Sequence, residues 1–195
     1  MSRFVLLAMA LVCVAAACGV HAQDESVRGR DGVRASVGDR ASELAAALDK
    51  TKYKKKEKHG VTTEFYIDIK NRLRSPAGGP GEFTGSYVCE SGEYKLDLKI
   101  SADGTATGSG LDTNMDEEKP LAFTLRDARV DGSLLRATKV FDDGSTEAFE
   151  AVFVDRTTST GRNAQAIDST ETEFGIGFIR SEKDGTNRIF MQRKL

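Results

Sequence analysis

The sequence predicts a mainly β protein: an antiparallel up-and-down meander that closes as an eight-stranded barrel, preceded by one short helix and one strand. After residue 82, β-type segments follow one another with almost no helical period. Short turn signals separate these segments, and Asp-Gly is among the strongest of such signals. Strands joined by short loops must close or leave exposed edges, and eight strands close around a filled or ligand-sized interior. The turn signals are Ser91-Gly92, Asp103-Gly104, Asp131-Gly132, Asp143-Gly144 and Asp184-Gly185.

Residues 1–22 have the layout of a secretory signal peptide. Arg3 precedes an apolar run from Phe4 to Cys18, and small residues follow it. We predict cleavage after Ala22 and export to the periplasm or the medium, with no transmembrane helix in the mature chain. The alternative is a membrane-anchored lipoprotein attached through Cys18, because Ala15-Ala16-Ala17-Cys18 resembles the lipobox of bacterial lipoproteins.

The cysteine and histidine counts exclude several classes of site. The chain has three cysteines and two histidines, and the predicted mature chain keeps only Cys89 and His59. A disulfide scaffold, a histidine-rich metal site and a catalytic triad each need more than that. We therefore expect no metal and no cofactor, and a hydrolase is the least supported class of function.

The segments before the barrel differ in composition. Residues 23–40 are polar and charged, which favours a disordered leader. Residues 41–74 are predicted to form a helix with Ser42 as N-cap and Gly60 after its end, followed by a strand over 61–70. Residues 75–82 contain prolines and glycines and are predicted to be a linker, and the β-barrel domain covers residues 83–195.

The ten residues 51–60 contain five lysines. Lysines in the last turns of a helix complement its dipole and are usually solvated. The alternative is attraction to an anionic envelope component, for which Lys54, Lys55, Lys56 and Lys58 are the candidate contacts. Nucleic acid is not an expected partner, because no aromatic stacking series accompanies these lysines.

Two hairpins allow their register to be predicted. A two-residue loop at Ser91-Gly92 pairs Tyr87 with Leu96 and Gly85 with Leu98. The same register pairs Phe83 with Ile100 at the end of the hairpin far from the loop. Thr84 and Ser86 then face outward. A three-residue loop ending in Gly144 pairs Lys139 with Glu147 and Arg136 with Glu150. The eight predicted strands are 83–90, 93–101, 105–111, 121–130, 133–141, 145–155, 173–180 and 188–194.

Two longer loops complete the barrel, at 113–120 and 156–172. We predict that neither carries structure of its own. Asp112, Asp116, Glu117 and Glu118 cluster at the first, where a solvated acidic loop is favoured over a calcium site. Cys89 is expected to be an inert, inward-facing cysteine.

The segment from Phe83 to Val88, with Ala106-Thr107-Gly108-Ser109-Gly110 after it, resembles the opening hairpins of calycin-type barrels, the lipocalin and avidin families. Those families carry Gly-x-Trp on the first strand, where this chain has Gly85 and Tyr87 and no tryptophan anywhere. The resemblance implies the barrel fold and binding of an apolar small molecule.

Two functions are therefore expected. The first is an exported, non-enzymatic barrel that binds a small apolar ligand in its interior. The alternative is an envelope interaction, structural or protease-inhibitor-like protein that acts through its surface loops and the lysine-rich helix. The sequence leaves the oligomeric state open. The candidate ligand-binding residues are Tyr87, Tyr94, Leu96, Leu98, Phe149, Phe153, Phe174 and Phe178.

Overall fold

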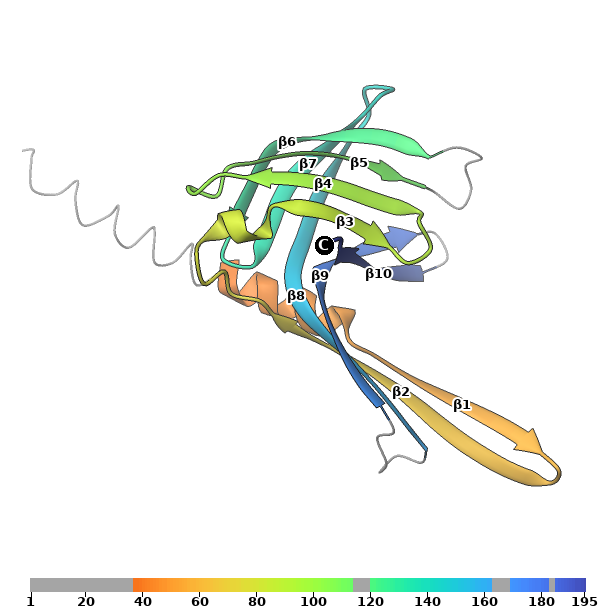
Figure 1. Cartoon of the computed structure of the whole chain (residues 1–195). Helices are drawn as coiled ribbons and strands as arrows, with labels where there is room; N and C mark the ends of the chain where they lie inside the picture. Colours follow the sequence, from red (N-terminus) through yellow and green to blue (C-terminus); the bar gives the residue numbers. More distant parts are fainter. Residues whose placement is uncertain (1–36, 114–119, 163–168, 183–184) are drawn as a thin grey trace, which may run out of the picture. The chain divides into compact units, whose positions relative to one another are not determined.

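The computed structural model describes residues 37–113, 120–162, 169–182 and 185–195 (Figure 1). The predicted signal peptide, the alternative lipidation site Cys18 and most of the predicted leader lie outside the described residues. The same holds for Asp116, Glu117 and Glu118 of the acidic loop. The unit described below, Val37–Leu195, is compact by itself.

Eight antiparallel strands form a closed up-and-down barrel, which confirms the predicted fold class. Each strand pairs with the next along the chain, β10 pairs with β3, and β8 pairs with β9 in addition to β7. Closure leaves the barrel part of the sheet without a free edge. The strands are β3 Gly85–Cys89, β4 Tyr94–Ile100, β5 Ala106–Asp112, β6 Leu121–Asp131, β7 Leu134–Phe141, β8 Thr146–Arg162, β9 Ser169–Glu182 and β10 Gly185–Arg193.

The predicted registers of both hairpins are confirmed in their central parts. Tyr87 lies opposite Leu96 and Gly85 opposite Leu98. In the second hairpin, Arg136 lies opposite Glu150 with a side-chain hydrogen bond of 3.1 Å, and Lys139 lies opposite Glu147. The turn at 142–144 has three residues, because the Phe141 N–H donates to the Ser145 carbonyl.

The prediction is wrong at the end of the first hairpin that lies far from its turn. Phe83 belongs to a short 3-10 helix, η1 (Pro80–Phe83), and the strand begins only at Gly85. The Ile100 N–H donates to the Thr84 hydroxyl at 2.9 Å, so a side chain takes the place of the predicted backbone partner. Thr84 is consequently half-buried, contrary to the prediction that it faces outward.

Phe83 and Tyr87 pack at the η1 end of the barrel. The Phe83 ring stacks on Phe153 with 4.0 Å between ring centroids, and both residues are fully buried. The Tyr87 hydroxyl donates to the Phe83 carbonyl at 2.6 Å. Arg193 donates to the Glu82 and Thr84 carbonyls, at 3.1 and 2.7 Å, and so ties the last strand to η1.

Burial raises the pKa of Tyr87 well above its usual range, although the charges of Arg193 and Arg74 act in the opposite direction. The folded state therefore retains this proton above pH ~10, where tyrosines of the unfolded chain ionise. Stability contributed by Tyr87 is present below that pH and falls as the pH rises through it. We expect Tyr87→Phe to flatten the alkaline decline in the free energy of unfolding, measured by urea titration from neutral to alkaline pH. An unchanged slope would contradict the buried position of the phenol.

Strands β8 and β9 continue past the barrel, and this was not predicted. The first half of β8 pairs with β7, from Thr146 to Val152, and its second half pairs with β2 (Val61–Leu73) on the same edge. Residues 156–162 and 169–172, predicted to be loop, are strand. With β1 (Lys50–Lys58) on the outside, the order β1-β2-β8-β9 makes a four-stranded extension that projects from the barrel, which we call the arm (Figure 1).

The helix before the arm covers residues 37–48 in the described part of the chain. The prediction of Ser42 as its N-cap is wrong, because Ser42 lies inside the helix and its hydroxyl donates to the Gly38 carbonyl. The buried side chains of the helix recur at helical spacing and pack on the outer face of the barrel against Leu134, Val152 and Val154. The Arg40 guanidinium adds a hydrogen bond of 2.9 Å to Glu150. The buried side chains of the helix are Val37, Ala41, Leu44, Ala45 and Leu48.

The predicted continuation of this helix to Lys58 is wrong, because Lys50–Lys58 is strand β1. Every residue of β1 lies directly opposite a residue of β2, so pairing with this strand outweighs the helix propensity of the lysines. Gly60 does not follow a helix. His59 and Gly60 both have positive φ, 54° and 75°, as the two central residues of a type I′ hairpin turn require.

Candidate functional site

The predicted ligand-binding residues lie together inside the barrel, where they contact one another. Seven of the eight are buried, and Phe174 is partly buried against the same cluster. Phe178 makes edge-on contacts with Tyr94 and Phe149, with ring centroids 5.5 and 5.2 Å apart. The predicted lining is thus the packed core of the barrel.

One small space in this interior, of about 10 Å³, lies beside Tyr94, Phe149 and Phe178. About 10–15 Å³ is the smallest space that holds one water molecule. A ligand at this place would therefore have to displace packed aromatic side chains. The ligand-binding role of these residues remains an untested prediction.

A buried charged cluster, which was not predicted, lies in the same interior. Lys139 is 2% exposed and donates to the Asp112 carboxylate at 2.7 Å. Arg180 donates to the other oxygen of that carboxylate at 2.6 Å and to the Tyr94 hydroxyl at 2.8 Å. Asp112, predicted to belong to a solvated loop, is 1% exposed, which corrects that prediction.

Three aromatic rings surround the Lys139 ammonium group. Its nitrogen lies 4.8 Å from the centroid of Phe149, 5.0 Å from Phe123 and 5.4 Å from Phe178. Ring faces stabilise a cation at such distances, and the Asp112 carboxylate balances its charge. Both Asp112 oxygens accept a hydrogen bond, so two cations hold this carboxylate inside the barrel.

The lysine-rich segment forms an exposed strand rather than a helix end. All nine residues of β1 are exposed. Residues directly opposite in an antiparallel pair lie on the same face of the sheet, and successive residues alternate between faces. The register of β1 with β2 therefore divides the four predicted contact lysines: Lys54, Lys56 and Lys58 share a face, and Lys55 lies on the other.

We call the face that carries Lys54 the lysine face. Two lysines that were not predicted as contacts, Lys50 and Lys52, extend its column to five. Alternate residues of a strand are about 6.6 Å apart, so five positive charges follow one another along the edge of the arm. The side chains opposite them on β2 are Val61, Thr63, Phe65, Ile67 and Ile69, and none of these is acidic.

The opposite face of the hairpin is electrically balanced. Lys55 forms a 2.9 Å ion pair with Glu64. Thr51 donates to Asp68 at 2.9 Å, and Lys70 lies 3.7 Å from the same carboxylate. Both acidic and basic groups are present here, whereas on the lysine face the charged side chains in the paired part of β1 and β2 are all basic.

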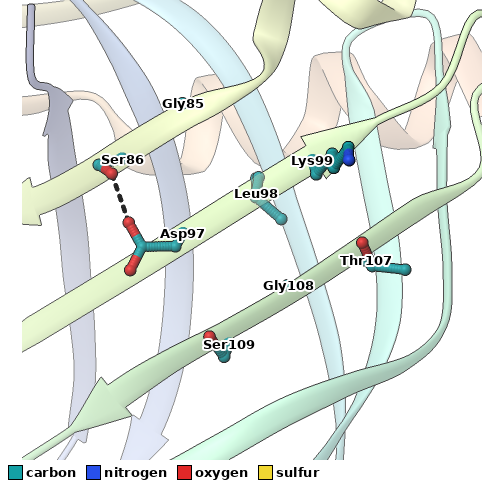
Figure 2. Close-up of a pocket in the computed structure, with 8 residues that line it drawn as sticks. All are labelled: Gly85, Ser86, Asp97, Leu98, Lys99, Thr107, Gly108 and Ser109. Carbon is teal, nitrogen blue, oxygen red and sulfur yellow. Dashed lines mark hydrogen bonds between the residues drawn. The ribbon is translucent and has the colours of Figure 1, made fainter.

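A shallow depression of about 470 Å³ lies on the outer surface of β3, β4 and β5 (Figure 2). Ser86 is hydrogen-bonded to Asp97 across it. Ser109 and Thr107 lie on the next strand, opposite Asp97 and Lys99. The short side chains explain the depression, but no buried polar group points into it. We assign no site to it.

The remaining candidates are the Cys89 thiol and groups of metal-ligating side chains. Cys89 is half-buried at the end of β3 and accepts a contact of 3.3 Å from the Ser91 hydroxyl. Across the part of the chain that the structure describes, no three His, Cys, Asp or Glu side chains group closely enough to hold a metal ion. No helix within that part is long and apolar enough to cross a bilayer.

Comparison with protein-family models, with curated proteins and with solved structures found no match. The resemblance to lipocalin and avidin barrels stays a prediction beyond the barrel topology itself.

Proposed function

We propose that this protein is an exported, non-enzymatic barrel that binds an anionic surface of the cell envelope through the lysine face of its arm. Three features support the proposal. The N-terminal sequence has the layout of a secretory signal, the predicted ligand-binding residues pack against one another in the barrel core, and β1 carries five exposed lysines in one column. The barrel then serves as a rigid base for the arm.

The column of five lysines carries this proposal. A lysine near an anionic surface contributes about 1 kcal/mol. Five lysines contribute about 5 kcal/mol, which corresponds to a dissociation constant on the order of 0.1 mM. Binding by charge alone is thus reversible and sensitive to salt.

Neutralising three lysines of this face should weaken binding to an anionic matrix. We expect Lys54→Gln, Lys56→Gln and Lys58→Gln together to lower the affinity for immobilised dextran sulfate on the order of a hundredfold, because three favourable charges are lost. The measurement is retention of the protein at several salt concentrations. All three positions are exposed, so the barrel should keep its unfolding midpoint.

A second triple variant is the matched control. Lys55→Gln, Lys95→Gln and Lys99→Gln remove the same net charge from exposed positions away from the lysine face. We expect little loss of retention from this variant. Equal loss from both triples would show that net charge matters rather than the arm, and would refute the proposal.

Protection of an edge is the competing explanation for the lysines, because lysines on an edge strand prevent pairing with another chain. Under that explanation, the variant at Lys54, Lys56 and Lys58 self-associates in size-exclusion chromatography and keeps its retention on dextran sulfate. Under our proposal, retention is lost.

A further inference from the structure

On the lysine face, the column of lysines on β1 lies beside a mainly apolar column on β2, and the proposed function does not use this second column. Within the hairpin, β2 places Val61, Phe65, Ile67 and Ile69 beside the lysine column. Val61 is 65% exposed at the tip, and Ile67 and Ile69 are half-buried. Of the five β2 residues opposite the lysine column, only Thr63 is polar. One face of the hairpin thus combines an exposed cationic column with a partly exposed apolar column.

We infer that the anionic surface is a lipid bilayer, and that the hairpin lies on it with the lysine face toward the lipid. This inference rests on the proposed function and specifies its target. An amphipathic element binds the boundary between headgroups and acyl chains when its apolar side enters that boundary and its cations meet anionic headgroups. The long apolar stems of lysine suit this position, because the stem contacts lipid while the ammonium group stays hydrated.

The two columns distinguish a bilayer from a soluble polyanion. An anionic polysaccharide would be bound by the lysines alone, and the apolar column would add nothing. A bilayer interacts favourably with both columns, which together make one side of the hairpin amphipathic. The opposite face fits neither target, because Lys55 is paired with Glu64 and Thr51 with Asp68.

Tryptophan fluorescence can show which face meets lipid, because the chain contains no tryptophan of its own. Val61→Trp places a single indole on the lysine face, and Thr62→Trp places one on the opposite face at the next position. Both positions are exposed, and tryptophan is well tolerated in strands. The probes are phosphatidylglycerol vesicles with and without brominated acyl chains, and phosphatidylcholine vesicles as the uncharged control.

We expect the indole at position 61 to shift its emission to shorter wavelength on phosphatidylglycerol vesicles and to be quenched by brominated chains. The indole at position 62 should show neither change, and phosphatidylcholine should be ineffective for both. The two variants share the same N-terminal segment, so attachment through the apolar run Phe4–Cys18 would affect them equally. Equal quenching of both indoles, or of neither, would overturn the inference.

The lysine dependence of this signal completes the experiment. In the Val61→Trp protein, the further changes at Lys54, Lys56 and Lys58 should weaken vesicle binding on the order of a hundredfold. The changes at Lys55, Lys95 and Lys99 should leave it nearly unchanged. If dextran sulfate retains the protein through the lysine face while the indole at position 61 gives no lipid signal, the proposed function stands and the bilayer inference fails.

Discussion

Replacing Tyr87 with alanine is expected to lower the free energy of unfolding by about 3–5 kcal/mol. Its ring is fully buried between η1 and the barrel core and lies near Phe153 and Phe174, with ring centroids 6.0 and 6.3 Å away. Removal of the ring leaves a cavity and also leaves the Phe83 carbonyl without its hydrogen-bond donor. A domain of typical stability, about 5–15 kcal/mol, would become marginal.

Ser86→Ala is the matched control for this experiment, since Ser86 directly precedes Tyr87 and is exposed. We expect it to cost about 0.5 kcal/mol or less. Tyr87→Phe keeps the ring and should cost about 1 kcal/mol for the lost hydrogen bond. Urea denaturation of the three variants provides the comparison, and a Tyr87→Ala protein as stable as Ser86→Ala would disprove the inward register of β3.

Loss of the Asp112 carboxylate is expected to have an effect of similar size. Asp112→Ala leaves the Lys139 ammonium group inside the barrel without the carboxylate that balances it. Glu147 lies 3.9 Å from Lys139, but that side chain is about half exposed to solvent. Removing one partner of a buried ion pair costs about 3–5 kcal/mol.

Lys139→Met should cost less, about 1–2 kcal/mol, because Arg180 still pairs with Asp112 and methionine fills the space among the three phenylalanine rings. The double variant tests the contact directly. If Asp112 and Lys139 act as a pair, the two changes are non-additive by about 1–3 kcal/mol. Strict additivity of the two unfolding free energies would show that they do not interact.

The barrel could be predicted because its strands are half-buried. A strand with one face in the core alternates apolar and polar residues, and Tyr94, Leu96, Leu98 and Ile100 are all buried between exposed neighbours. The turn signals then determined the register. At the η1 end the prediction failed, because the Thr84 side chain replaces a backbone group as the hydrogen-bond acceptor for Ile100. No residue pattern predicts such a replacement.

The arm could not be predicted in the same way. Residues 157–160 of β8 are Thr-Thr-Ser-Thr, which form a strand between β2 and β9 without an apolar alternation. Lys50–Lys58 has good helix formers, and only its pairing with β2 makes it a strand. Tertiary pairing determined both elements.

One signal for the buried cluster was present in the sequence. The predicted second hairpin places Lys139 on the same face as Leu135 and Ala137, and both lie in or against the core. A lysine on a core-facing column requires an acidic partner. Its partner is Asp112 on β5, and the contact depends on how β5 and β7 both pair with β6, which could not be derived from residues 27 positions apart.

The central claim is that the protein binds through the lysine face and not through the barrel interior. A map of backbone amide shifts by nuclear magnetic resonance tests it most directly. Short-chain polyphosphate is added to the full-length protein as a soluble anionic probe. We predict that the shifts concentrate on β1 and the β1–β2 turn, with Tyr94, Phe149 and Phe178 unchanged. Shifts concentrated at those three interior residues, or none in β1, would contradict the assignment of binding to the arm.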